Sequence, residues 1–366
     1  LRVWGESGMV GRKKLKTRCN IILFCTFLIV FSFGCKKESG QKISGEEILD
    51  EEHFIISKAI LKPLPILEED FLFESSHGWL DNDTIIFSAK KDEEYYLYSY
   101  NLSLEKKELI YQTNKMIAEA SISANGEYIL LYTFEDDAEA FIHILNAEGE
   151  EQYVVAIPSK EIAYSWNQDS ETKLVLNAFY EDWTFSTFIL DFKEGKMEEI
   201  FLSQPFAKWY TDDKFIYIQL DDEAPELTGA LLIANGNNDR LDVVLENVAM
   251  FESGKEILFA AQASKENVLE YVFLSDGKEK NRLTVSMDMA NTVGSIPEFE
   301  LQEDLNAFYT FIPSEEAYQF IMYNYEKGDY QVILEDIAAA PISVSPNGKR
   351  YLYGYSLENL IEVSVK

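Results

Sequence analysis

The sequence has 366 residues, with 64 acidic and 32 basic side chains and a formal net charge of −32. Nucleic acid is not expected as a partner, because affinity for phosphate groups requires clustered Lys and Arg that displace counterions. Apolar residues make up 47% of the chain and aromatic residues 14%, so a large core can form and intrinsic disorder is not expected over most of the length.

The first recognisable element is a targeting segment that starts near Met9. Basic side chains cluster between residues 12 and 18, and an apolar run of 13 residues follows at 21–33. At about 1.5 Å per residue this run is too short to cross a bilayer core of about 30 Å. The layout predicts a secretory signal peptide over residues 1–34 that is removed on export. Residues 1–8 lack targeting character and would be untranslated if Met9 is the start.

The segment Ser32-Phe33-Gly34-Cys35 closes this signal. It resembles the lipobox of bacterial lipoproteins, although Ser32 stands where that family usually has Leu. The resemblance implies that Cys35 is acylated and becomes the first residue of a protein held at the extracytoplasmic face of the cell membrane. An ordinary cleaved signal beside an incidental cysteine is the alternative. The chain has three cysteines, and only Cys35 would remain after cleavage, so no internal disulfide is expected.

Residues 35–52 follow as a segment rich in Lys, Glu, Ser and Gly. It contains few apolar side chains to bury, and we predict a solvated tether between the lipid and a folded domain at residues 53–366. Removal of residues 1–34 takes away six basic side chains and one acidic one, so the mature protein is still more acidic. Electrostatic attraction to anionic lipid is therefore not expected, and the acyl chains would have to hold the protein at the membrane.

A polar turn recurs seven times along the rest of the chain. Each copy has a large apolar residue, then a turn rich in Asp, Asn, Ser or Gly, then an apolar run with strand character. Measured on the leading apolar residue, the spacings are 43, 44, 43, 42, 50 and 43 residues. The leading residues are Trp79, Ile122, Trp166, Trp209, Phe251, Leu301 and Val344.

The repeats continue with a third short apolar run, as at residues 95–100, and, except in the last repeat, a fourth, as at residues 108–111. Four short strands in about 43 residues, separated by turn residues, are typical of one blade of a β-propeller. The sequence therefore predicts an all-β fold, a propeller of four-stranded blades with seven repeats. A β-sandwich of similar strands is disfavoured by the fixed period.

The last repeat contains only about three apolar runs before the chain reaches Val365. Propellers commonly complete such a blade with a strand from the other end of the chain, and residues 54–61 are available for this role. We therefore expect N-terminal and C-terminal strands to close the ring together.

Two turns carry a more specific pattern. Residues 345–349, Ser-Pro-Asn-Gly-Lys, resemble the Ser-Pro-Asp-Gly-Lys signature of the propeller repeats in TolB and in prolyl-peptidase propellers, and residues 123–127 are a weaker copy. The lipobox followed by a degenerate propeller resembles the YqgU-like lipoproteins of Gram-positive bacteria over nearly the whole mature chain. That family is described as six-bladed, so the resemblance implies six blades where the repeats indicate seven.

No catalytic or metal-binding constellation is recognisable. The histidines His53, His77 and His143 fall on different predicted elements. The chain has neither a Gly-x-Ser-x-Gly elbow nor a glycine-rich phosphate loop. The acidic segments at residues 81–83 and 136–137 lack the Gly and the later Glu of a calcium loop of the EF-hand type. We expect neither a metal nor a cofactor.

Candidate ligand-binding residues lie in loops of one rim of the predicted propeller. Because strands alternate in direction, loops that join second and third strands emerge on the same rim as the connectors between blades. This rim is acidic with interleaved aromatic residues, and loops on a rigid scaffold often bind ligands. The candidates are Asp136, Asp137, Tyr180, Trp183, Asp221 and Asp222. The competing interpretation is that these loops are simply solvated, and Trp79, Trp166 and Trp209 are expected in the core.

The sequence favours an extracytoplasmic lipoprotein whose propeller binds a cationic protein, a peptide or a polymer of the cell envelope. The alternative is a propeller enzyme, of the lyase or glycosidase type, that acts on an envelope polysaccharide. Carboxylates are abundant enough for glycoside chemistry, but their number says nothing about the spacing that such chemistry needs.

Overall fold

The computed structural model describes residues 56–66, 71–135, 139–220, 228–236, 240–264, 268–286, 296–315 and 317–365. The predicted signal peptide, Cys35 and the tether lie outside these residues. Within them the chain forms 27 strands and one short 3-10 helix, η2 (Glu303–Leu305). None of the described residues forms a helix that is long and apolar enough to cross a membrane.

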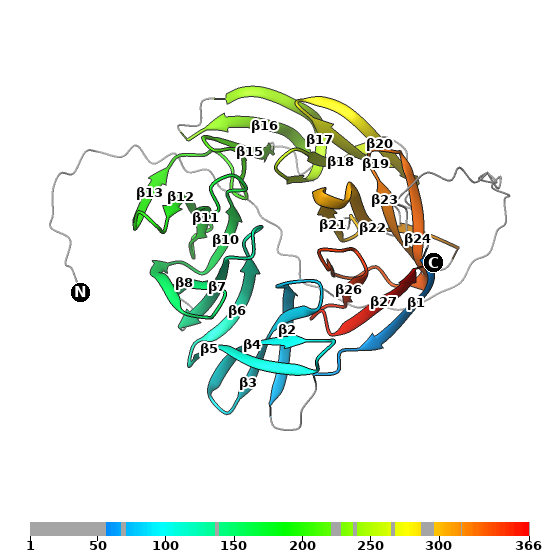
Figure 1. Ribbon diagram of the computed structural model, residues 1–366. Coiled ribbons are helices and arrows are strands. Elements are labelled where there is room, and N and C mark those ends of the chain that lie inside the picture. The colour runs from blue at the N-terminus through cyan, green and yellow to red at the C-terminus, as the bar shows by residue number, and fades with distance from the viewer. Residues whose placement is uncertain are drawn as a thin grey trace.

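The strands form a ring of antiparallel sheets around a central axis (Figure 1). Each unit runs outward from an inner first strand to an outer fourth strand. The first three units are β2 (Leu72–Trp79), β3 (Thr84–Lys91), β4 (Glu94–Asn101) and β5 (Lys106–Thr113); β6 (Met116–Ile122), β7 (Tyr128–Glu135), β8 (Glu139–Asn146) and β9 (Glu151–Pro158); and β10 (Glu161–Trp166), β11 (Lys173–Phe179), β12 (Phe185–Asp191) and β13 (Lys196–Ile200).

The next sheet has seven strands: β14 (Lys208–Thr211), β15 (Lys214–Gln219), β16 (Gly229–Asn235), β17 (Arg240–Ser253), β18 (Leu258–Ser264), β19 (Val268–Ser275) and β20 (Lys278–Ser286). Strand β17 has 14 residues and belongs to two successive units. Its first part pairs with β16 as an outer strand, and its last part pairs with β18 as the inner strand of the following unit. Two four-stranded units are therefore joined into one sheet.

The last two sheets complete the ring. They are β21 (Phe299–Gln302), β22 (Ala307–Pro313), β23 (Tyr318–Asn324) and β24 (Asp329–Ile337), then β25 (Ile342–Val344), β26 (Arg350–Tyr353) and β27 (Asn359–Val365) with β1 (Ile56–Pro63). Strand β1 is antiparallel to β27, with Leu61 opposite Ile361. The closure of the ring by strands from both ends of the chain is confirmed, and Figure 1 shows the two strands side by side.

The all-β propeller predicted from the repeats is confirmed. The apolar run that follows each polar turn overlaps the second strand of a unit, and the run after the turn that starts at Trp166 forms β11. These second strands read as continuous apolar runs because the units pack against each other on both faces. In β11, residues 174–178 are all buried, whereas the outer strand β13 is mostly exposed. A strand with one covered face would instead alternate.

The apolar core is divided among the seams between units. In the described residues seven buried clusters occur, each formed by side chains of two neighbouring units. Seven seams require seven units in a closed ring, although β17 reduces the number of hydrogen-bonded sheets to six. Trp79 and Trp209 are buried in two of these seams, and Trp166 packs partly buried against a third.

Candidate functional site

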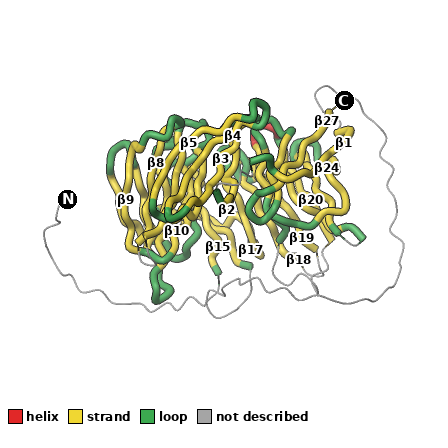
Figure 2. Tube along the Cα trace, turned by 90° about the horizontal axis from the view of Figure 1, so that it is seen from below, coloured by secondary structure: helices red, strands yellow, loops and turns green. Residues whose placement is uncertain are grey.

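The propeller has two rims, which Figure 2 shows as the two edges between which the strands run. The turn rim carries the turns between first and second strands, at residues 80–83, 123–127, 167–172, 212–213, 254–257, 303–306 and 345–349. The connector rim carries the loops between second and third strands and the connectors between units, among them residues 159–160, 180–184, 201–207 and 354–358.

Side chains of the turn rim bond to the turns that contain them. The Asp81 carboxylate accepts hydrogen bonds from the backbone N–H groups of Asp83 and Thr84, both at 2.7 Å. In the turn that resembles TolB repeats, Ser345 Oγ donates to Asn347 Oδ1 (3.0 Å) and accepts the N–H of Arg350 (3.0 Å). Gly348 follows at φ 67°, which glycine adopts without strain. The recurring polar residues therefore close turns.

Contacts also run along this rim from unit to unit. Both carboxylate oxygens of Glu303 accept backbone N–H groups of the preceding unit, from residues 255, 256 and 257, at 2.7–3.0 Å. The Glu171 carboxylate accepts the N–H of Asn125 (2.8 Å), and Arg350 pairs with Asp83 across the closure of the ring. The polar groups of the turn rim thus tie the blades together.

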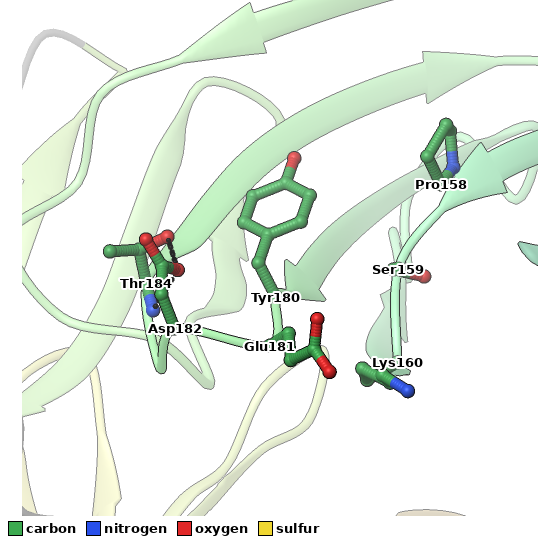
Figure 3. Close-up of a pocket in the computed structure, with 7 residues that line it drawn as sticks. All are labelled: Pro158, Ser159, Lys160, Tyr180, Glu181, Asp182 and Thr184. Carbon is green, nitrogen blue, oxygen red and sulfur yellow. Dashed lines mark hydrogen bonds between the residues drawn. The ribbon is translucent and has the colours of Figure 1, made fainter. Parts of the chain in front are cut away.

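A pocket of about 430 Å³ lies on the connector rim between two segments of the chain. Its lining residues are Pro158, Ser159, Lys160, Tyr180, Glu181, Asp182 and Thr184. Pro158 ends β9, Ser159 and Lys160 form the connector to β10, and the others belong to the loop between β11 and β12. Figure 3 shows Tyr180 and Glu181 facing this connector. The volume lies within the range of small-molecule sites.

Backbone hydrogen bonds hold both walls of the pocket. The N–H of Tyr180 donates to the carbonyl of Thr184 (2.9 Å), and the N–H of Trp183 donates to the carbonyl of Tyr180 (3.0 Å). The Asp182 carboxylate accepts the hydroxyl of Thr184 at 2.6 Å. The N–H of Lys160 donates to the carbonyl of Phe179 at 2.8 Å, which joins the walls. The pocket is thus set by the backbone before any ligand arrives.

Two charged side chains of the pocket remain available to a ligand. The Lys160 ammonium and the Glu181 carboxylate are exposed, and neither forms a hydrogen bond or an ion pair with another described residue. Tyr180 is partly buried against the neighbouring apolar cluster and presents its ring to the pocket. The pocket therefore offers a cation, an anion and an aromatic surface within one small volume.

Exposed aromatic side chains accompany the pocket. Trp183 is 54% exposed and Phe206, in the connector between β13 and β14, is 51% exposed. Both have left-handed backbone conformations, at φ 63° and 62°, which are rare for bulky residues. The Phe206 ring lies 5.1 Å from the ring of Phe179, the residue that precedes the pocket loop. Aromatic surface thus continues beyond the pocket.

The structure places two of the predicted ligand-binding residues at this pocket. Tyr180 lines it, and Trp183 belongs to the same loop. The candidates Asp136, Asp137, Asp221 and Asp222 lie outside the described residues.

Sequence reasoning missed Pro158, Ser159, Lys160 and Phe206. The signal that could have identified Ser159, Lys160 and Phe206 is their place in connectors between units, because strand alternation puts every such connector on this rim, and Pro158 is the strand residue that precedes one of them.

Several ionisable groups lie on inner strands, away from the pocket. The Tyr164 hydroxyl donates to Glu119 (2.8 Å), and burial raises the pKa of Glu119. Burial raises the pKa of Glu300 to about 7, although its carboxylate accepts the N–H of Val344 from the next unit (2.8 Å). Burial lowers the pKa of His77 to about 4, and its Nδ1 accepts the N–H of Ala120 (3.3 Å). These groups join neighbouring blades.

One arrangement has the order of a catalytic triad. Thr133 Oγ1 lies 3.2 Å from His143 Nε2, and His143 Nδ1 lies 2.8 Å from Glu151, which also accepts the Tyr111 hydroxyl (3.1 Å). Thr133 is 0% exposed, so its hydroxyl has no access to a substrate. Among the described residues, no group of three His, Cys, Asp or Glu side chains is placed to hold a metal ion. The contacts of His143 instead join the outer strand of the first unit to the second unit.

Comparisons with known proteins agree with the fold. The chain is 27% identical over 353 residues to the uncharacterized lipoprotein YqgU of Bacillus subtilis, covering 95% of this chain and 94% of the relative. It resembles the crystal structure of the uncharacterized protein lmo1340 from Listeria monocytogenes, with a TM-score of 0.73 and 23% identity over 81% of this chain and 93% of that one.

A more distant likeness is to an oligogalacturonate lyase from Vibrio parahaemolyticus. The TM-score is 0.56 and the identity 12%, over 85% of this chain and 98% of that chain. At this identity only the fold is shared.

The sequence profile described as "YqgU-like 6-bladed beta propeller domain" matches residues 101–354, which is well over half of the chain. In this ring, six hydrogen-bonded sheets contain seven four-stranded units, because β17 belongs to two of them. The repeats, the ring closure and this match lead to one conclusion: the chain belongs to the family of YqgU-like β-propellers.

Proposed function

We propose that this protein is a lipid-anchored binding module on the outer side of the cell membrane and that its connector rim binds a polymer of the cell envelope. The relative from Bacillus subtilis carries the name lipoprotein, and the segment ending at Cys35 resembles a lipobox in this chain as well. Acylation of Cys35 would hold the propeller at the membrane without a membrane-spanning helix.

The pocket beside Tyr180 is the observation that carries the proposal. It combines a ring, an exposed carboxylate at Glu181 and an exposed ammonium at Lys160 on walls fixed by backbone hydrogen bonds. Ligand sites commonly pair an apolar surface with a few polar groups that fix orientation. On the turn rim, in contrast, Asp81, Ser345 and Glu303 are bonded to groups of their own or a neighbouring turn.

Charge narrows the ligand to a neutral or cationic polymer. The net charge of −32 repels polyanions at low and moderate ionic strength, and the pocket carries two carboxylates, Glu181 and Asp182, against one ammonium. Glycans that carry amines or acetamides meet this condition, whereas polyuronates do not.

No second function is proposed. The shared propeller fold of the lyase carries no activity by itself, since unrelated activities recur on one fold. The triad-like group of Thr133, His143 and Glu151 cannot act on a substrate, because the Thr133 hydroxyl is fully buried.

The anchor is tested by metabolic labelling with a fatty-acid analogue. We expect label on the wild-type protein and none on Cys35→Ser, which would also leave the membrane fraction. Labelling of the Cys35→Ser variant would refute the anchor.

The binding role is tested by retention of full-length protein, solubilised in detergent, on purified cell-wall material. We expect retention to fall when Tyr180→Ala and Trp183→Ala are combined. Tyr330→Ala, at a 50% exposed tyrosine on the outer strand β24, and Tyr355→Ala, at an 82% exposed tyrosine elsewhere on the connector rim, serve as matched controls. Equal retention of the double variant and the wild type would refute the pocket as the binding site.

A further inference from the structure

Phe206 is an exposed residue of the connector at residues 201–207, as is Phe201, which is 69% exposed directly after β13. Leu202, Gln204, Pro205 and Ala207 of the same connector are all buried, whereas half of the Phe206 surface is open to solvent. A phenylalanine that faces outward between buried neighbours leaves apolar surface exposed to solvent. Burial of the ring would be the favourable arrangement if only folding mattered.

The backbone at Phe206 adds to this argument. Its φ of 62° lies in the left-handed region, which L-residues with bulky side chains adopt at a cost in free energy. Trp183 has the same left-handed conformation, at φ 63°, and a similar exposed fraction. Such conformations persist where surrounding structure holds them and cluster at ligand sites. Two exposed aromatic residues with this conformation on one rim therefore indicate a surface that contacts a ligand.

Phe206 extends the aromatic surface of the pocket loop, to which Trp183 itself belongs. Phe206 lies against Phe179, and Phe179 is followed directly by Tyr180 of the pocket. The end of β9 and the connector at residues 159–160 form the other wall of the pocket, and the connector at 201–207 contacts Phe179, just before the pocket loop, through Phe206. A ligand in the pocket that continued over Phe179 would cross from the third unit toward the fourth.

We propose that the site has two parts, the pocket at Tyr180 and an aromatic extension at Phe206, and that its ligand is a glycan chain of amine-bearing or acetamido sugars long enough to span both. This inference rests on the binding role proposed above. One face of a sugar ring presents C–H groups that pack on an aromatic ring, while its edge presents hydroxyls and amines. An ammonium group on such a sugar is attracted both to the Glu181 carboxylate and to aromatic faces.

The test compares oligomers of glucosamine and of N-acetylglucosamine, one to six units long, by calorimetric titration of the full-length protein in detergent. For the wild type we expect affinity to rise about tenfold between the shortest and the longest oligomers as the Phe206 ring is engaged. Phe206→Ala should remove this gain with length and leave the affinity for short oligomers unchanged. Tyr180→Ala should weaken binding at every length.

Two further variants keep the result interpretable. Phe206→Gly accepts the positive φ without strain, so it should fold as the wild type does and reproduce the loss of length dependence. Tyr355→Ala, at the exposed tyrosine of another loop on the same rim, should behave as the wild type.

The outcomes separate the two proposals. Length dependence that survives in Phe206→Gly would overturn the extension while the pocket stands. If no oligomer binds the wild type but hexalysine binds in a manner that depends on Phe206, the glycan is the wrong occupant. If neither probe binds the wild type and Tyr180→Ala leaves retention on cell-wall material unchanged, the binding role itself fails.

Discussion

Both rims of this propeller are polar, but polar side chains on the two rims differ in their bonding partners. On the turn rim, Asp81, Asn347 and Glu303 bond to backbone groups of their own or adjacent turns. On the connector rim, Lys160 and Glu181 face solvent beside exposed aromatic rings. Polarity alone therefore does not identify a binding surface. What distinguishes the pocket on the connector rim is that the Lys160 ammonium and the Glu181 carboxylate have no protein partner among the described residues and that large apolar side chains are exposed beside them.

The largest expected effect comes from removing a tie between blades on the turn rim. Glu303→Ala leaves three backbone N–H groups of the preceding unit without their carboxylate, and we expect the free energy of unfolding to fall by about 3 kcal/mol. Urea denaturation measures the change. Cell-wall retention of the folded variant should equal that of the wild type. A loss below 0.5 kcal/mol would show that these bonds do not hold the units together.

The second effect is a pH dependence at the seam that Glu300 bridges. Its pKa is about 7 in the folded protein, against a value near 4.5 when unfolded. Between these values the folded state keeps a proton that the unfolded state releases. The contribution to stability is therefore complete below about pH 4.5 and is lost as the pH rises through 7.

After allowance for partial solvation, we expect wild-type stability relative to Glu300→Gln to fall by about 2 kcal/mol between pH 4.5 and pH 8. Urea midpoints of both proteins across this range are the measurement. Parallel curves for the two proteins would contradict the assignment.

A smaller effect separates binding from stability on the connector rim. Asn tolerates the left-handed conformation better than Trp, so Trp183→Asn should raise the free energy of unfolding by about 1 kcal/mol and weaken ligand retention. Thermal unfolding and the cell-wall assay provide the two readouts. If the variant is less stable than the wild type, Trp183 is a structural residue and its exposure has no functional meaning.

The smallest expected effect is at Glu181. Glu181→Gln should change the free energy of unfolding by less than about 0.5 kcal/mol, because the carboxylate has no partner among the described residues. Retention of a cationic polymer should fall and become less sensitive to salt. Glu148→Gln, at an exposed glutamate in the turn between β8 and β9, is the matched control and should leave retention unchanged. Equal losses for both variants would indicate a general charge effect and not a site.

Much of the fold could be predicted because its signals are local. Asx turns with a glycine at positive φ depend on a few consecutive residues, so the turns near residues 125 and 347 reveal the repeat. A repeat of four short strands then predicts the blade, and the missing strand of the last repeat predicts closure by the N-terminal strand, as β1 and β27 show. The double role of β17 has no such local signal, because it depends on which neighbour each half of the strand meets.

The site could be predicted only in part. Tyr180 and Trp183 were found because strand alternation assigns their loop to the connector rim. Lys160 could not be predicted, because the residues across the pocket from it are about 20 positions away in sequence and belong to the next unit. Phe206 could not be predicted, because an apolar residue between Pro205 and Ala207 is expected in the core. Hydrophobicity alone does not show that Pro205 and Ala207 are buried while Phe206 is exposed.

The sequence by itself determined the class of this protein, the ring of repeats and its closure, because turn chemistry and strand patterning act over a few residues. It also predicts the targeting segment and Cys35, which lie outside the described residues. Only the tertiary structure decided which polar residues hold the ring together and which are left for a ligand. That distinction depends on the partner each side chain meets in a neighbouring blade, about 43 residues away along the chain.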